Sequence, residues 1–153
     1  MSRTRIRVGF PRLNRTPFFL TSPATPQYNC IAWAVGDERR WWWPVSEPHR
    51  EAYWPAGVAR RVEISTFIAA FATLGYEPCP SADLEPGFEK VALFADPHGT
   101  PTHAAKQLGT GRWSSKLGPE EDIDHSIYGL EGGVYGTVVQ YIRRPIPRSP
   151  LER

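Results

Sequence analysis

The chain has 153 residues, of which 18 are basic and 16 acidic, and its formal net charge of +2 is too small to indicate a nucleic-acid partner. With 41% apolar residues and six tryptophans it can bury enough surface to fold as a single domain. No apolar run approaches the roughly 20 residues that span a membrane, and the N-terminus lacks the apolar segment of a secretory signal. We therefore expect a cytoplasmic protein, or one exported without a signal peptide, with no membrane partner.

The two ends of the chain are rich in arginine and proline. Residues 1–24 are predicted to form an irregular arm, because Pro11 and Pro17 interrupt the apolar stretches there. Residues 25–144 are predicted to form the single folded domain, followed by a tail over 145–153. The two cysteines, Cys30 and Cys79, are expected to stay reduced in a cytoplasmic protein.

The stretch from Thr25 to Gly36 predicts an extended approach followed by a short apolar helix. Asn29 is a favourable N-cap residue, which places Cys30 at about the first helical position. Free backbone amides and the helix dipole favour a thiolate there, as the nucleophile of a thiol hydrolase requires. The alternative is that Cys30 is a small core residue, as most lone cysteines are.

Two aromatic clusters follow, at residues 41–44 and 53–55, and each ends in a proline. The prolines indicate extended or turn backbone, with the rings packed on a surface. One interpretation is that these rings form one side of the hydrophobic core, next to the short helix. The other is an aromatic groove that holds a peptide or sugar chain near Cys30.

A core helix is predicted from Ile64 or Ser65 to Leu74, because apolar residues recur at three- and four-residue steps before Gly75. Strands are then predicted over 90–95, 102–108, 112–117 and 135–142, and residues 120–130 are expected to be helical or irregular. Helices followed by a meander of strands indicate an α+β fold, with short N-terminal helices packed on an antiparallel sheet of about four strands.

His103 opens the second of these strands, where an imidazole is fixed by the sheet yet exposed at its edge, as a general base needs. If the hairpin turns at Thr110, His103 lies across from Leu117, with Ser115 two residues along on the same face. Ser115 is thus a candidate to orient the ring. Further candidates for that role are Asp122, Asp124 and His125, although His125 is otherwise expected on an acidic surface.

The segment from His103 to Trp113 resembles the histidine hairpin of NlpC-type peptidases in the papain-like superfamily, and Asn29 to Trp33 is loosely similar to their nucleophile helix. The resemblance covers Cys30–Val35 and about 91–117. It implies a papain-like fold with Cys30, His103 and Ser115 as catalytic residues. The sequence departs from the pattern in having Asn before the cysteine, where Asp is usual, and Ser as third residue. The whole chain also looks like an uncharacterised family of small bacterial domains.

The resulting hypothesis is a cysteine hydrolase, an amidase or peptidase, without metal or cofactor. Cys30 would attack a carbonyl carbon, and His103 would take the thiol proton and return it to the leaving group. The oxyanion would bind the amide of Cys30 together with Gln27 or Tyr28. Further residues expected to line the substrate groove are Asn29, Trp33, Trp43, Trp54 and Trp113.

Two rival hypotheses remain open. The first is a non-catalytic module of the same fold, in which Cys30 is buried and the tryptophan surface binds a peptide or a partner protein. The second is a bacterial effector or toxin domain that shares the hydrolase chemistry.

Overall fold

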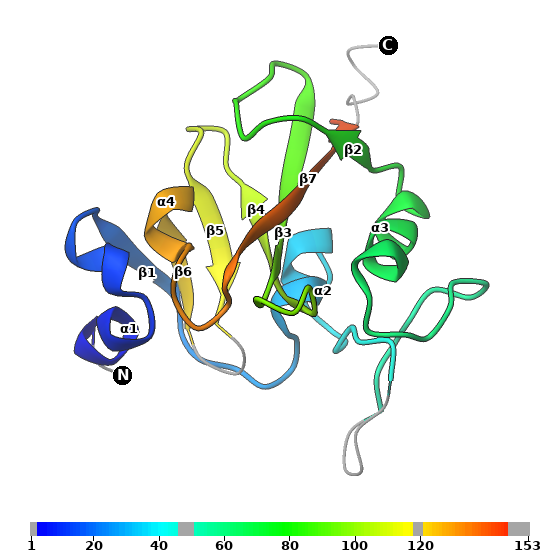
Figure 1. The fold of residues 1–153 in the computed structure, drawn as a ribbon, viewed down its shortest axis with the longest axis horizontal. Helices are drawn as coiled ribbons and strands as arrows, with labels where there is room; N and C mark the ends of the chain where they lie inside the picture. Colours follow the sequence, from blue (N-terminus) through cyan, green and yellow to red (C-terminus); the bar gives the residue numbers. More distant parts are fainter. Residues whose placement is uncertain (1–2, 46–50, 118–120, 147–153) are drawn as a thin grey trace.

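The computed structural model describes residues 3–45, 51–117 and 121–146, and its centre is one antiparallel sheet (Figure 1). Within these ranges the sheet has seven strands in the order β1-β6-β5-β4-β3-β7-β2. The α+β class and the antiparallel sheet are as predicted, whereas the expected number of about four strands was too low. The strands are β1 (Phe18–Ser22), β2 (Glu77–Cys79), β3 (Phe88–Ala95), β4 (Pro101–Gln107), β5 (Trp113–Lys116), β6 (Asp122–His125) and β7 (Thr137–Pro145).

In the described part of the chain, five short helices accompany the sheet and form two groups, which lie well apart in Figure 1. The first group packs beside the start of the chain, and the second contains the two helices that the sequence predicted. The helices are α1 (Arg3–Gly9), the 3-10 helix η1 (Pro11–Asn14), α2 (Cys30–Val35), α3 (Ile64–Ala72) and α4 (Ile127–Leu130).

The sheet separates two hydrophobic cores, because successive side chains of a strand point to opposite faces. On β3, Leu93 packs with the core that contains α2 and α3, and Phe94 packs with the core that contains α1, η1 and α4. On β4, Ala104 belongs to the first core and Ala105 to the second. Both faces of these strands are therefore buried, which explains the continuous apolar run Val91–Ala95 of β3.

The elements that the sequence missed lie mainly at the edges of the sheet. The supposedly irregular arm contains α1, η1 and β1, and β1 follows Pro17 directly. At the opposite edge, β2 includes Pro78. Proline is tolerated in edge strands because one side of the backbone needs no ladder partner. The missed β6 has a polar sequence without an apolar period, and it forms because β1 and β5 pair with it on either side.

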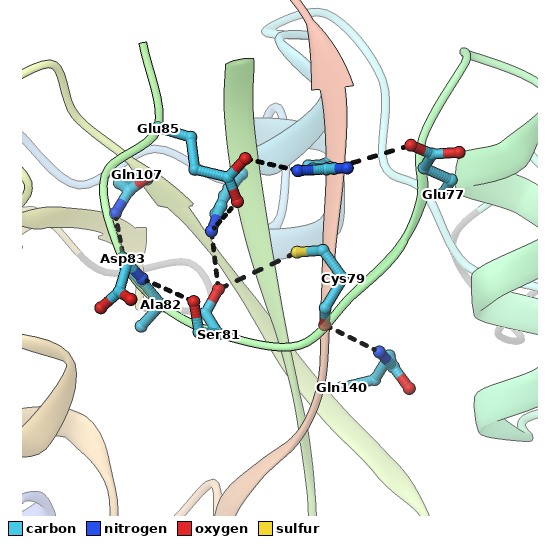
Figure 2. Close-up of polar contacts among 10 residues, drawn as sticks. Glu77, Cys79, Ser81, Ala82, Asp83, Glu85, Gln107 and Gln140 are labelled. Atoms are coloured by element: carbon cyan, nitrogen blue, oxygen red, sulfur yellow. Dashed lines mark hydrogen bonds and ion pairs between the residues drawn. The ribbon is translucent and has the colours of Figure 1, made fainter.

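Polar contacts tie the loop after β2 to the sheet, and Figure 2 shows those around Ser81 and Glu85. Lys90 of β3 has no exposed surface, and its Nζ donates to the carbonyl of Ser81 at 2.9 Å and contacts Glu85 at 2.8 Å. Glu85 also forms an ion pair with Arg143 of β7. The charge of Lys90 is thus compensated, which is the condition under which a buried lysine is tolerated.

Gly136 sits where no other residue fits, directly before β7. Its φ is +80°, and a Cβ atom there would overlap the backbone of Ala95 and Asp96. We expect Gly136→Ala to lower the free energy of unfolding by about 3 kcal/mol, from backbone strain and overlap with an element that cannot move easily. Urea unfolding measures this change. The control is Gly109→Ala, where no atom lies within 4 Å of the added Cβ. Equal losses in the two variants would contradict the explanation.

Candidate functional site

Cys30 is the first residue of α2, as the sequence predicted. The side chain of Asn29 caps the helix by accepting from the N–H of Ala32 at 3.2 Å, and Gly36 ends it with a φ of +87°. The cysteine is only 7% exposed. Burial raises the pKa of the Cys30 thiol to about 11, although the backbone amides of Ala104, Ile31 and Cys30 itself act in the opposite direction. At neutral pH the resting group is therefore a thiol.

The structure brings His103 and Ser115 together, on β4 and β5. Lys106 pairs with Ser114 and Gln107 with Trp113, which is the register predicted from a turn at Thr110. The strands pair only at their turn-proximal ends, and His103 Nε2 bonds Ser115 Oγ at 2.9 Å beyond that point. The imidazole of His103 is 1% exposed.

His125 of β6 completes this buried chain, which corrects its expected place on an acidic surface. Its Nε2 lies 2.7 Å from Ser115 Oγ, and its Nδ1 lies 2.7 Å from the carbonyl of Ser126. Neither His125 nor Ser115 has exposed surface. Burial lowers the pKa of His125 to about 4 and holds the pKa of His103 well below its usual range. Both rings are therefore neutral at pH 7.

The partners fix the hydrogen positions along the chain. The carbonyl of Ser126 only accepts, so Nδ1 of the neutral His125 carries the proton and Nε2 is an acceptor. Ser115 then donates to His125 and accepts from Nε2–H of His103. The remaining nitrogen of His103, Nδ1, is an unprotonated acceptor that is buried and has no hydrogen-bond partner within the described residues.

The structure places Cys30 close to the backbone of His103 but packs the two side chains in different cores. The backbone N–H of Ala104, the residue after His103, lowers the pKa of the Cys30 thiol. The side chain of Cys30 packs in the first core. The ring of His103 instead stacks on Tyr135 at 4.2 Å and meets Phe94 edge-on at 5.3 Å, and both of these pack in the second core. In the described part of the chain, no hydrogen bond joins Cys30 to His103.

Most of the predicted substrate-binding aromatics are packed inside the protein. Tyr28 is buried and donates to Asp122 Oδ2 at 3.2 Å, and Trp54 is 3% exposed. Trp113 lies in the second core, away from α2. Trp33 and Trp43 are half-buried against the first core, where Trp33 donates to Ser114 Oγ at 3.0 Å and Trp43 meets Phe67 edge-on. The interpretation that the rings of the two aromatic clusters form a wall of the core beside α2 is correct for Trp43 and Trp54.

Asn29 has a second function that its role as a cap did not predict. Its Nδ2 donates to the carbonyl of Trp42 at 2.7 Å, and its Oδ1 accepts from the N–H of Trp42 at 3.0 Å. The side chain thus holds the 41–43 segment against the start of α2. Tyr53 joins the same segment through backbone bonds to Trp41 and Trp43 at 2.8 and 3.1 Å. Only an amide both donates and accepts in this way, which explains an asparagine rather than an aspartate at position 29.

A groove of about 660 Å³ opens beside this braced segment, between Pro26 and Gln27 on one side and residues 39–41, 51–54 and 60 on the other. Gln27, predicted as an oxyanion donor, lines it together with Trp54. The exposed residues Arg39, Arg40, Glu51 and Arg60 also line it, with the rings of Trp41 and Tyr53. A neighbouring hollow of about 670 Å³ shares Arg39 and Arg40 but adds Asp37 and Glu38. Neither hollow is lined by Cys30 or His103.

Sequence reasoning missed His125 and the arginines of the groove. His125 lies on the same face of β6 as Ile123, and both are fully buried, but the polar sequence of this strand contains a single apolar residue and gave no clear signal. The arginines at positions 39, 40 and 60 offered no signal either, because their convergence on one groove depends on the path of the loop.

Comparison with known proteins gives one match. The family model described as Domain of unknown function (DUF7689) matches residues 19–143. No curated protein and no solved structure matches the chain. Among the described residues, no helix has the length and apolar character to cross a membrane, and no cluster of three metal-ligating side chains occurs. The family description names no activity, so the papain-like resemblance stays a prediction. Because the match covers most of its length, the chain belongs to the DUF7689 family.

Proposed function

We propose that this protein is a binding module whose groove, lined by residues 26–27, 39–41, 51–54 and 60, takes a peptide segment of a partner protein. The observation that carries the proposal is a preformed groove of about 660 Å³ lined by partly exposed aromatic rings and exposed charged side chains. That volume is in the usual range of ligand sites, and tryptophan, tyrosine and arginine side chains are typical of binding hot spots.

Two features support binding rather than a structural role for this region. The side chain of Asn29 and the backbone of Tyr53 hold the segment around Trp42 in place, so little order has to be gained when a ligand binds. The guanidinium groups at the rim, in contrast, are exposed to solvent. A rigid wall with exposed polar groups suits recognition of an extended peptide.

The proposal is tested by NMR titration of the indole N–H signals with a pool of blocked hexapeptides of acidic, basic, polar and aromatic composition. We expect the signal of Trp41, which lines the groove and is partly exposed, to shift. The signals of Trp54 and Trp113 are the internal controls, because these residues are 3% and 2% exposed. Absence of any shift of Trp41 at millimolar peptide would refute the binding function.

We propose a cysteine hydrolase as the second candidate function, because of the state of His103. Its Nδ1 is unprotonated and without a partner in the described part of the chain, while Nε2 is held by Ser115. A general base for Cys30 needs an oriented ring with such a bare nitrogen. The burial of the thiol is evidence against a hydrolase, because the raised pKa of Cys30 makes the thiolate rare at neutral pH.

The two functions are separated by acylation with p-nitrophenyl acetate, followed by mass spectrometry. For a hydrolase we expect an acetyl group on Cys30, repeated turnover, and loss of both in Cys30→Ala and in His103→Asn. Cys79→Ala is the matched control, since Cys79 lies on the edge strand β2, which two strands separate from the β4 strand of His103. An unmodified Cys30 at pH 7, or acetylation that is indifferent to His103, would exclude the hydrolase.

A further inference from the structure

Arg40 is held in one orientation at the rim of the groove. Its Nε donates to Asp37 Oδ2 at 2.9 Å, and its guanidinium carbon lies 3.7 Å from the centre of the Tyr53 ring. Within the described residues, neither terminal nitrogen of this guanidinium donates a hydrogen bond. Arginine stacked on an aromatic ring and fixed at Nε presents its remaining edge for bidentate contact with an oxyanion.

Two further cations converge on the same groove. Arg39 and Arg60 line it, and their guanidinium groups form no ion pair or hydrogen bond with other residues that the structure describes. Among the described residues that line the groove, three are arginines and one, Glu51, is acidic. Asp37, which pairs with Arg40 from the neighbouring hollow, offsets one further charge, so the balance of these residues stays positive.

We propose that the ligand of the groove is an acidic peptide, with a carboxylate bound by the terminal nitrogens of Arg40 and further attraction from Arg39 and Arg60. This inference rests on the proposed binding function and names its ligand class. The aromatic rings of Trp41 and Tyr53 contribute the apolar contacts. Ligand charge then supplies selectivity, since opposite charges steer association and like charges disfavour it.

The test compares an acetylated, amidated hexapeptide containing Asp and Glu with its isosteric twin containing Asn and Gln. We expect the acidic peptide to bind at least about tenfold more tightly at low salt, as charge-assisted bonds exceed neutral ones by that order. The difference should shrink as salt is added. Arg40→Gln and, separately, Arg60→Gln should reduce the preference. The guanidinium of Arg60 forms no ion pair or hydrogen bond with a described residue. A loss of preference in Arg60→Gln therefore cannot be attributed to misfolding.

Arg15→Gln is the matched control, because it removes the same charge from the C-terminal end of η1. A loss of affinity in that variant as large as in Arg40→Gln would mean unspecific attraction and overturn the inference. Equal binding of the two peptides, with the Trp41 signal shifting in both, would overturn it while the binding function stands. Failure of both peptides and of the mixed pool to shift this signal would refute the binding function itself.

Discussion

Asn29→Asp is expected to destabilise the protein by about 2–4 kcal/mol at pH 7, although the two side chains have nearly the same shape. The substitution removes the N–H donor that reaches the carbonyl of Trp42 at 2.7 Å and leaves this carbonyl facing an anion. Asn29 is 3% exposed, so water cannot compensate for the loss. Aspartate keeps the cap of α2, whose favourable effect of about 1 kcal/mol is smaller than the loss. Urea unfolding gives the difference directly.

The pH dependence of Asn29→Asp distinguishes this cause from general damage. Burial and the facing carbonyl raise the pKa of the introduced carboxyl group above its value in the unfolded chain. Its protonated form donates to Trp42 again, so the deficit relative to the original protein should shrink as the pH falls from 7 to about 4.5. The matched control is Asn14→Asp on the exposed end of η1, expected within about 0.5 kcal/mol. A deficit independent of pH, or as large in the control, would contradict the assigned role.

The stability of the protein is expected to fall as the pH drops below about 6.5, the ordinary pKa of histidine. The folded state lowers the pKa of His125 to about 4 and that of His103 well below the usual range. The unfolded chain therefore binds more protons than the native protein below pH 6.5, and acid favours unfolding. For His125 alone the full effect corresponds to roughly 3 kcal/mol, reached near pH 4. Urea unfolding between pH 7.5 and 5 measures the slope.

Two buried histidines set the size of that slope. Because both take up a proton on unfolding, the slope below pH 6 should approach about 2.7 kcal/mol per pH unit. His98→Gln is the control, because His98 is exposed in the turn before β4 and should leave the slope unchanged. A stability that stays flat between pH 6.5 and 5 would mean that the histidines are already protonated in the folded protein, against the hydrogen-bond assignment.

Local signals in the sequence predicted several elements correctly. The cap at Asn29 and the glycine at 36 define α2, and the apolar spacing from Ile64 defines α3. The turn at Thr110 sets the register of β4 and β5, and that register brings Ser115 to His103. These features depend on residues within one turn or one hairpin, which is why a single sequence was sufficient to predict them.

Other features were decided by contacts between segments far apart in the chain. A helix start contributes about 1 kcal/mol or less toward a thiolate, whereas burial raises the pKa of Cys30 to about 11, which corresponds to roughly 3 kcal/mol against the thiolate. Burial depends on packing against β4, which the residues around Cys30 do not specify by themselves. His125 becomes part of a buried chain only because β6 pairs between β1 and β5.

The groove also depends on contacts between segments far apart in the chain. The sequence by itself determined which aromatic and basic residues are present, and it determined the helix cap that Asn29 makes. Only the tertiary structure decided that Trp42 and Trp54 turn inward while Arg39, Arg40 and Arg60 meet beside Tyr53. The physical reason is that side-chain exposure and the convergence of charges depend on the path of the backbone in space, which no local propensity specifies.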